Sequence, residues 1–226
     1  MDGSDQLAAL ATLNEPVRRR LYDFVAAQPD AVGRDEASES VGVPRSVAAF
    51  HLDKLADAGL LEVQFRRPPG KAGPGAGRPA KLYRRAAREI SLSVPERHYD
   101  LAGVLLARGV ATAESQGVSP SQGVRTAARD HGREIGRQSP RGPRAGAGRR
   151  EIEEVLRENG YEPFVERNAV VLANCPFHTV AEEQRDLVCG MNLAFLEGVL
   201  EGLGATRHEA SLEPSPGRCC VTVRPR

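Results

Sequence analysis

The stretch PRSVAAFHLDKLADAG, residues 44–59, decides the fold of the first part of this chain. Proline is favoured in the first turn of a helix and glycine directly after its end, so Pro44 and Gly59 mark the two ends of a helix over 44–58. Between them, apolar residues recur at helical spacing at Ala48, Leu52 and Leu55. The stretch therefore predicts a helix with one buried face and one face open to a partner.

The segments on both sides extend this helix into a motif. Before it, helices are predicted over 6–13, 15–28 and 34–41, and a turn at Gly42-Val43 follows. After it, strands are predicted over 60–65 and 81–85, joined by a basic segment rich in Gly and Pro. Helices followed by a hairpin with a basic tip are typical of a winged helix-turn-helix, whose second helix enters the major groove of DNA.

The rest of the chain mixes helices and strands. Helices are predicted over 96–113, 124–137, 151–159 and 186–203. Strands are predicted over 165–168, 169–173, 207–212 and 218–223, and a Pro-, Gly- and Arg-rich loop over 137–150. We expect an α+β protein with a winged helix-turn-helix domain at 1–90, a helical linker and dimerisation region at 91–150, and a small cysteine-bearing sensor domain at 151–226.

Charge is distributed unevenly along the chain, although the net charge is only +1. Residues 45–88 hold ten Lys or Arg against three acids, whereas residues 151–226 hold thirteen acids and seven bases. This asymmetry favours a protein that binds phosphate with one end. No leader and no run of ~18–20 apolar residues is apparent, so we expect a soluble cytoplasmic protein with no membrane partner.

The outward side chains near the start of the helix 44–58 are the candidates for reading DNA bases. They are Arg45, Ser46, Ala49, Phe50 and, one turn later, Lys54. Arg45 could pair with guanine and Phe50 could contact a thymine methyl, although Phe50 could equally be a core residue. Wing residues are expected to contact phosphates: Arg66, Arg67, Lys71, Arg78 and Lys81. His51 fits a packed, hydrogen-bonded role as well as a phosphate contact.

All four cysteines lie in the last quarter of the chain: Cys175, Cys189, Cys219 and Cys220. In a cytosolic protein this favours metal, cluster or redox chemistry over structural disulfides, but buried, inert cysteines remain an equal alternative. No Cys-x-x-Cys pair is present, which argues against a small zinc ribbon. We expect Cys189 before or at the start of a helix. Cys219 and Cys220 are expected on the last strand, where neighbours point to opposite faces.

The first half resembles the ArsR-like winged-helix regulators. The resemblance covers residues 6–86 and is carried by Pro44-Arg45-Ser46-Val47, His51-Leu52-Asp53-Lys54-Leu55, Ala58-Gly59-Leu60-Leu61 and Gly77-Arg78-Pro79. The Cys-Val-Cys metal motif that some of those regulators carry on the recognition helix is absent. The resemblance therefore implies DNA binding without metal sensing at that helix.

The second half resembles the sensor domain of SufR-type regulators, which repress iron–sulfur cluster assembly operons. The carrying residues are Cys175-Pro176-Phe177-His178, Cys189-Gly190-Met191-Asn192 and Cys219-Cys220-Val221. The resemblance implies a homodimeric repressor with a cluster, typically [4Fe–4S], held by three cysteines. Cys175 and Cys189 match the first two ligands, and Cys220 or Cys219 the third. His178, the spare cysteine, Asp186 or an exogenous ligand would complete the set.

Other functions are weighed against this one. The C-terminal part could instead bind zinc or act as a dithiol switch, or it could hold a small molecule in a pocket bounded by Phe177, Leu196 and Leu200. An enzyme is not expected, because the sequence lacks a Walker motif, a His-Glu-x-x-His motif and any catalytic triad pattern. The helices 96–113 and 186–203 are the candidates for a dimer interface.

Overall fold

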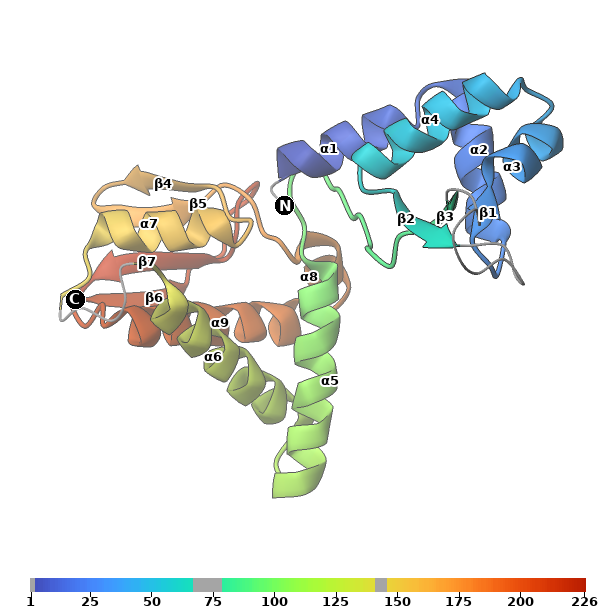
Figure 1. Cartoon of the computed structure of the whole chain (residues 1–226). Helices are drawn as coiled ribbons and strands as arrows, with labels where there is room; N and C mark the ends of the chain where they lie inside the picture. Colours follow the sequence, from blue (N-terminus) through green and yellow to red (C-terminus); the bar gives the residue numbers. More distant parts are fainter. Residues whose placement is uncertain (1–2, 67–78, 141–145) are drawn as a thin grey trace. The chain divides into compact units, whose positions relative to one another are not determined.

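The computed structural model describes residues 3–66, 79–140 and 146–226. The chain forms two compact units, Met1–Leu92 and Ser93–Arg226 (Figure 1). This differs from the three regions expected, because residues 93–140 fold into the second unit and do not form a separate linker. Among the described residues, none of the helices combines the length and apolarity needed to cross a bilayer.

The first unit contains the elements that the sequence predicts and one more. Its helices are α1 (Gly3–Thr12), α2 (Pro16–Ala27), α3 (Arg34–Val41) and α4 (Arg45–Asp57). Its strands are β1 (Val32–Gly33), β2 (Leu61–Arg66) and β3 (Ala80–Arg85), in the antiparallel order β1-β3-β2. The short strand β1, which is not predicted from the sequence, pairs with β3 through Val32 and Tyr83.

The core of the first unit forms where α2, α3 and α4 meet the sheet. Its fully buried side chains include Leu21, Val25, Leu52, Leu55 and Tyr83. At the start of α2, the Glu15 carboxylate accepts hydrogen bonds from the backbone N–H groups of Val17 and Arg18 and so caps the helix. The predicted periodicity of α4 is confirmed, since Leu52 and Leu55 both lie in this core.

The second unit has five helices and four strands within its described residues. The helices are α5 (Tyr99–Gln116), α6 (Pro120–Gln138), α7 (Arg149–Glu158), α8 (His178–Glu183) and α9 (Arg185–Leu203). The strands are β4 (Pro163–Glu166), β5 (Ala169–Leu172), β6 (His208–Leu212) and β7 (Val221–Pro225), in the antiparallel order β4-β5-β7-β6. Strands β4 and β5 form a hairpin whose turn lies at Arg167-Asn168, where both residues adopt positive φ.

Helix α9 is the central helix of this unit. Apolar side chains on most of its faces are buried, and α7, α6 and the sheet contribute to the same core. The sequence predicts this helix as part of a dimer interface, but its burial within one chain leaves little of it for a second subunit. Helix α5 does expose apolar side chains, with Val104 46% and Val110 50% accessible.

Glycines bring α6 and α9 into backbone contact. A Cβ atom added at Gly132 would lie 2.0 Å from the carbonyl oxygen of Phe195, and one at Gly198 would lie 2.1 Å from that of Arg129. Gly136 and Gly202, one turn further along each helix, are nearly as close to the opposite backbone, at 2.5 and 2.3 Å. No larger residue fits at these positions without separating the helices.

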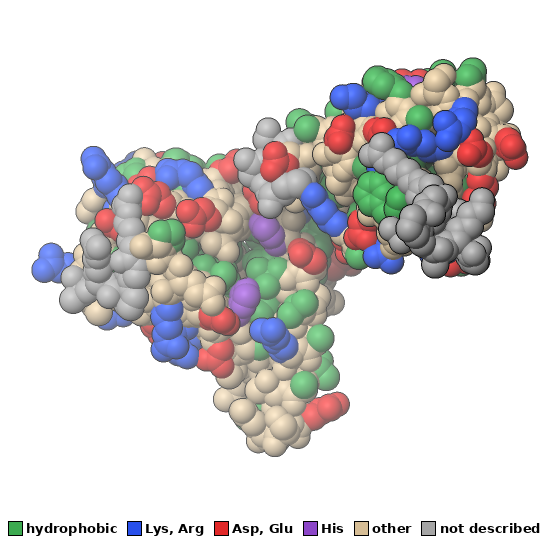
Figure 2. Space-filling view, in the orientation of Figure 1, with side chains coloured by type: hydrophobic (Ala, Val, Ile, Leu, Met, Phe, Trp, Pro, Cys, Tyr) green, Lys and Arg blue, Asp and Glu red, His purple; other side chains and the backbone are tan. Residues whose placement is uncertain are grey.

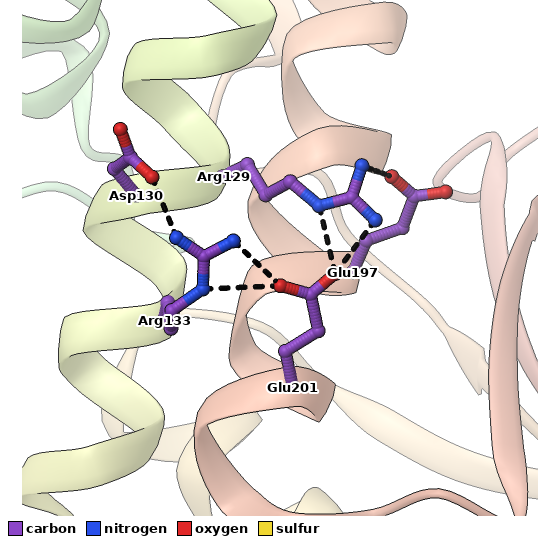
Figure 3. Close-up of polar contacts among 5 residues, drawn as sticks. All are labelled: Arg129, Asp130, Arg133, Glu197 and Glu201. Carbon is purple, nitrogen blue, oxygen red and sulfur yellow. Dashed lines mark hydrogen bonds and ion pairs between the residues drawn. The ribbon is translucent and has the colours of Figure 1, made fainter.

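Ion pairs line the exposed edge of the same contact (Figure 3). From α6, Arg129 and Arg133 point toward α9, where Glu201 accepts from both at 2.7 and 2.8 Å. Glu197 pairs with Arg129 at 3.4 Å, and Asp130 pairs with Arg133 at 2.7 Å. All these side chains are partly exposed, so their main effect is to fix the register of two helices that are already in contact.

Candidate thiol pocket and nucleic-acid interface

The four cysteines of the second unit line one pocket of about 850 Å³. They come from three separate segments: Cys175 follows β5, Cys189 lies on α9, and Cys219 and Cys220 precede β7. None of them forms a disulfide. The fold therefore gathers into one place side chains that are up to 45 positions apart, counted from Cys175 to Cys220.

The thiols contact one another as well as the pocket. Cys219 interacts electrostatically with Cys175 and Cys220, and Cys220 also interacts with Cys189. These interactions link all four thiols. Within the described residues, however, no group of three or more His, Cys, Asp or Glu side chains is arranged to hold a single metal ion.

Two expectations about the positions of the cysteines are wrong. Cys219 and Cys220 lie just before β7, which begins at Val221, and not on the strand. The alternation of side chains along a strand consequently does not apply to them, and both reach the pocket. Cys189 lies inside α9, which begins at Arg185, so it is not at the helix N-terminus where the dipole would favour a thiolate.

The environment of each thiol shifts its pKa. Hydrogen bonds from Cys219 and Cys189, together with the charge of Arg185, lower the pKa of Cys220 to about 6 despite its partial burial. The hydrogen bond from Cys219 lowers the pKa of Cys175 as well. Burial raises the pKa of Cys189 to about 12, and the contacts with Cys175 and Cys220 raise that of Cys219. Cys175 and Cys220 are therefore the sulfurs that most readily carry negative charge.

His178 and Asp186, the side chains expected to complete the ligand set of the cysteines, differ in their distance from the pocket. His178 lines the pocket at the start of α8, but its Nε2 is 3.3 Å from a carboxylate oxygen of Glu182. Asp186 is exposed and is not part of the pocket lining. Arg97 donates a hydrogen bond of 2.8 Å to the backbone carbonyl of Cys175, which adds positive charge near the thiols. His178 is thus better placed than Asp186.

In the first unit, α4 presents its N-terminal half to solvent. Arg45, Ser46, Phe50 and Lys54 are exposed, and Ala49 is half-buried. Phe50 is 56% accessible, so the alternative of a core phenylalanine is wrong. His51 packs beneath it, with ring centroids 5.2 Å apart, and its Nδ1 lies 3.5 Å from a carboxylate oxygen of Glu15. The packed interpretation of His51 is therefore supported.

Arg45 has a partner on the neighbouring helix α3, where its guanidinium forms an ion pair with Asp35. Both side chains are more than 60% accessible, so this pair contributes little to stability. Arg45 can therefore exchange Asp35 for another partner at little cost in stability.

A network around Asp53 joins α4 to the sheet. Its carboxylate accepts hydrogen bonds from Lys81 Nζ at 2.5 Å, from the Tyr83 hydroxyl at 2.6 Å and from Arg34 at 2.9 Å. Burial alone would raise the pKa of Asp53, but Lys81, Tyr83 and Arg34 lower it below its ordinary value. Burial and the bond to Asp53 raise the pKa of Tyr83 to about 12, so Tyr83 stays protonated as a donor.

The predicted wing contacts are only partly described. Arg66 is exposed at the end of β2, opposite Ala80 of β3. Lys81, also predicted to contact phosphate, is held by Asp53 inside the unit. Arg67, Lys71 and Arg78 lie outside the described residues. In the view of Figure 2, basic and acidic side chains are interspersed over the first unit, as expected where many of them form ion pairs.

A comparison with protein families identifies the first unit. A family model described as a helix-turn-helix domain matches residues 13–64. Residues 13–64 form a helix-turn-helix domain. No curated protein and no solved structure matches the chain. The domain is of the kind found in DNA-binding transcription regulators, which is consistent with the resemblance to ArsR-like winged-helix proteins.

The family model and the sequence prediction cover different parts of this unit. The matched segment ends within β2, whereas the returning strand β3, predicted over 81–85, is confirmed by the structure at Ala80–Arg85. Asp53 was noted only as part of a motif, because nothing in the local sequence shows that Arg34, Lys81 and Tyr83 converge on it. Their spacing of 19 to 30 positions requires the tertiary fold.

Proposed function

We propose that this protein is a homodimeric transcription repressor that binds operator DNA through its helix-turn-helix and senses the state of an iron–sulfur cluster held at the thiol pocket. The resemblance to SufR-type regulators makes iron–sulfur cluster assembly genes the proposed targets and [4Fe–4S] the proposed cluster. The observation that carries the proposal is the convergence of four thiols from three segments in one pocket.

The donor set fits an iron–sulfur cluster better than a single ion. Thiolates are the usual protein ligands of such clusters, and each of them binds a different iron atom. The ligands of a cluster therefore do not need to surround one point. Arg97 and Arg185 would offset part of the negative charge of bound thiolates.

The pocket joins residues next to β5 and β7, which are neighbours in the sheet, to a residue of α9, which packs in the same core. Cys175 follows the end of β5, Cys189 lies on α9 and Cys220 directly precedes β7. Residues that bind one group from three segments restrain the positions of those segments relative to one another. When bound, a cluster would supply reversible electron transfer and sensitivity to oxidants. Its loss would release the three segments, and DNA affinity would change if the helix-turn-helix responds to them.

On the DNA side, the exposed residues of α4 would read the major groove. Arg45 would pair with a base or phosphate, Phe50 would contact thymine methyl groups, and Ser46, Ala49 and Lys54 would complete the face. Arg66, together with Arg67 and Arg78, would contact phosphates from the wing.

The proposal is tested by anaerobic purification with a visible spectrum and analysis of iron, sulfide and zinc. A brown protein with about four irons and four sulfides per chain is expected of a [4Fe–4S] centre. Cys175→Ser and Cys189→Ser should each abolish iron binding, whereas Ser211→Ala, at a hydroxyl of β6 that does not line the pocket, should not. A wild-type protein that takes up no iron after reconstitution would contradict the cluster.

A second candidate is a zinc or dithiol switch, which the sulfur contacts favour. Cys175 and Cys219, and likewise Cys189 and Cys220, lie close enough to shift one another's pKa. One zinc per chain, or a mass loss of two hydrogens per oxidised pair, would support this candidate over the cluster. The pocket predicted for a small molecule is not found, because the side chains of Phe177, Leu196 and Leu200 are packed in the core.

A further inference from the structure

The stretch of chain that enters the second unit has no regular structure of its own. Between Arg85, where β3 ends, and Tyr99, where α5 begins, the described residues form neither helix nor strand. Leu92 is the last residue of the first unit, so residues 93–99, here called the entry segment, are the first that belong to the second. Contacts with other segments must therefore hold the entry segment in place, because its backbone is not part of a helix or sheet.

Hydrogen bonds join the entry segment to residues 175–179, here called the thiol loop because it contains Cys175. Arg97 Nη1 donates to the backbone carbonyl of Cys175 at 2.8 Å. The backbone N–H of the next residue, His98, donates to the carbonyl of Pro176 at 3.0 Å. Arg97 also lines the thiol pocket. Its charged group is therefore bonded to the residue that carries one of the pocket sulfurs, and charged donors form the stronger hydrogen bonds.

Further contacts order both ends of the entry segment. Ser93 Oγ accepts from the backbone N–H of Arg97 at 2.7 Å, across a bend in the chain. At the other end, the Tyr99 hydroxyl lies 2.8 Å from Oγ1 of Thr179, where the start of α5 meets α8 (Figure 1). The contact of Tyr99 with Thr179 is exposed to solvent and uncharged, so we expect it to contribute less than the bond of Arg97.

The thiol loop begins at a fixed point. Asn174, directly before it, is buried, and its side chain donates to the carbonyl of Gly160 at 3.0 Å and accepts from the N–H of Glu162 at 2.8 Å. The ring of His98 packs against the same glycine, since a Cβ atom at Gly160 would lie 2.4 Å from it. Because the start of the loop is held, a change in the loop backbone would act mainly on the entry segment.

We propose that the entry segment is a latch, closed by Arg97, through which the state of the thiol pocket controls the order of the chain that leads to the helix-turn-helix unit. A group bound to the sulfur of Cys175 restrains the residue whose carbonyl accepts from Arg97. The latch is closed while the pocket is occupied, and it opens more often when the group is lost. Its effect on DNA binding rests on the proposed function, whereas the latch itself does not.

Amide hydrogen exchange of the full-length apo protein in reductant tests the latch without iron or DNA. Arg97→Ala should speed exchange in residues 93–99 and 175–179 by about 10-fold, as expected for the loss of a charged hydrogen bond. Arg108→Ala, at an exposed arginine of α5 outside the pocket lining, is the matched control and should change neither segment. Unchanged exchange in Arg97→Ala would overturn the latch. If Arg97→Ala does not fold, Tyr99→Phe carries the test and should speed exchange in both segments by a smaller factor.

A second experiment tests the link to DNA. The wild type reconstituted anaerobically with iron and sulfide should differ from its apo form in operator affinity. Arg97→Ala should bring the two affinities together, and Thr179→Val, outside the pocket lining, should do so in part with the iron content of the wild type. An undiminished affinity difference in both iron-loaded variants would overturn the effect of the latch on DNA and leave the proposed function standing. A wild type that takes up no iron would overturn the proposed function, while hydrogen exchange would still decide the latch.

Discussion

The Tyr83 hydroxyl lies 2.6 Å from the carboxylate of Asp53, and this hydrogen bond joins the recognition helix α4 to the wing strand β3. Arg34 of α3 and Lys81 of β3 bind the same carboxylate. The helix that would read DNA bases and the strand that leads from the wing are therefore held by one side chain.

Replacing the carboxylate of Asp53 should lower the stability of the helix-turn-helix unit. Asp53→Asn removes the negative charge between two cations and should lower the free energy of unfolding by about 1–2 kcal/mol, at the low end for charged hydrogen bonds because Asp53 is partly exposed. Urea unfolding and hydrogen exchange of α4 would measure the loss. Asp57→Asn, at an exposed position on the same helix, is the control and should change little.

The same interaction has a pH dependence of known sign. Because the folded-state pKa of Asp53 is lowered, its stabilising contribution is complete above the unfolded-state pKa of about 3.9 and is lost as pH falls through the folded-state value. The difference in stability between wild type and Asp53→Asn should be constant near neutral pH and shrink below about pH 4. A difference that grows in acid would show that Asp53 is not charged in the folded protein.

Arg45 should contribute to sequence selectivity. Arg45→Ala is expected to weaken binding to a selected operator by about 1–3 kcal/mol and to weaken binding to random duplex DNA less. Fluorescence anisotropy with both duplexes at one salt concentration measures the two losses. Equal losses would make Arg45 a phosphate contact, since such contacts carry no sequence information.

Two basic residues of the hairpin should behave differently toward salt. Arg66 is exposed, so Arg66→Ala should reduce the slope of log affinity against log salt by about 0.9, the value for one phosphate contact. Lys81 is bound to Asp53, so Lys81→Ala should change the slope less and lower the stability of the unit more. Equal changes in slope would show that Lys81 leaves Asp53 to contact DNA.

Changing glycine to alanine should have opposite effects at two positions, one in the contact between α6 and α9 and one on the exposed face of α5. Gly198→Ala would place a methyl group 2.1 Å from the carbonyl oxygen of Arg129 and should destabilise the second unit by about 3 kcal/mol. Gly103→Ala, on the exposed face of α5 with nothing within 4 Å, should stabilise it by about 1 kcal/mol. Native-state hydrogen exchange of α6 and α9 measures both, and a harmless Gly198→Ala would contradict the close packing.

The sequence predicted the elements of the helix-turn-helix well because their signals are local. Pro44, Gly59 and the apolar spacing between them define α4 to within a residue of its bounds. The final strand was placed three residues early, since Arg218, Cys219 and Cys220 carry no signal that separates a turn from a strand. This shift determines whether both vicinal cysteines can reach the pocket.

The site depended still more on tertiary structure. The grouping of the cysteines could be expected from a family resemblance, but their contacts could not. Asn192 was noted only as part of the motif that carries the resemblance, because nothing in the local sequence shows that Tyr161 and Cys219 lie beside it. Its importance follows only from the burial of Tyr161 and Cys219 on either side of it.

The backbone contact at Gly132 and Gly198 determines how a disturbance at the thiols would spread. Two helices whose main chains touch have little room to slide past each other. A displacement of α9 at Cys189 would therefore displace α6 as well. Helix α6 is fastened to α5 in the same manner, since a Cβ at Gly123 would lie 2.2 Å from the carbonyl oxygen of Gly109. A displacement that starts at Cys189 would therefore be passed on through α6 to α5, the first helix of this unit.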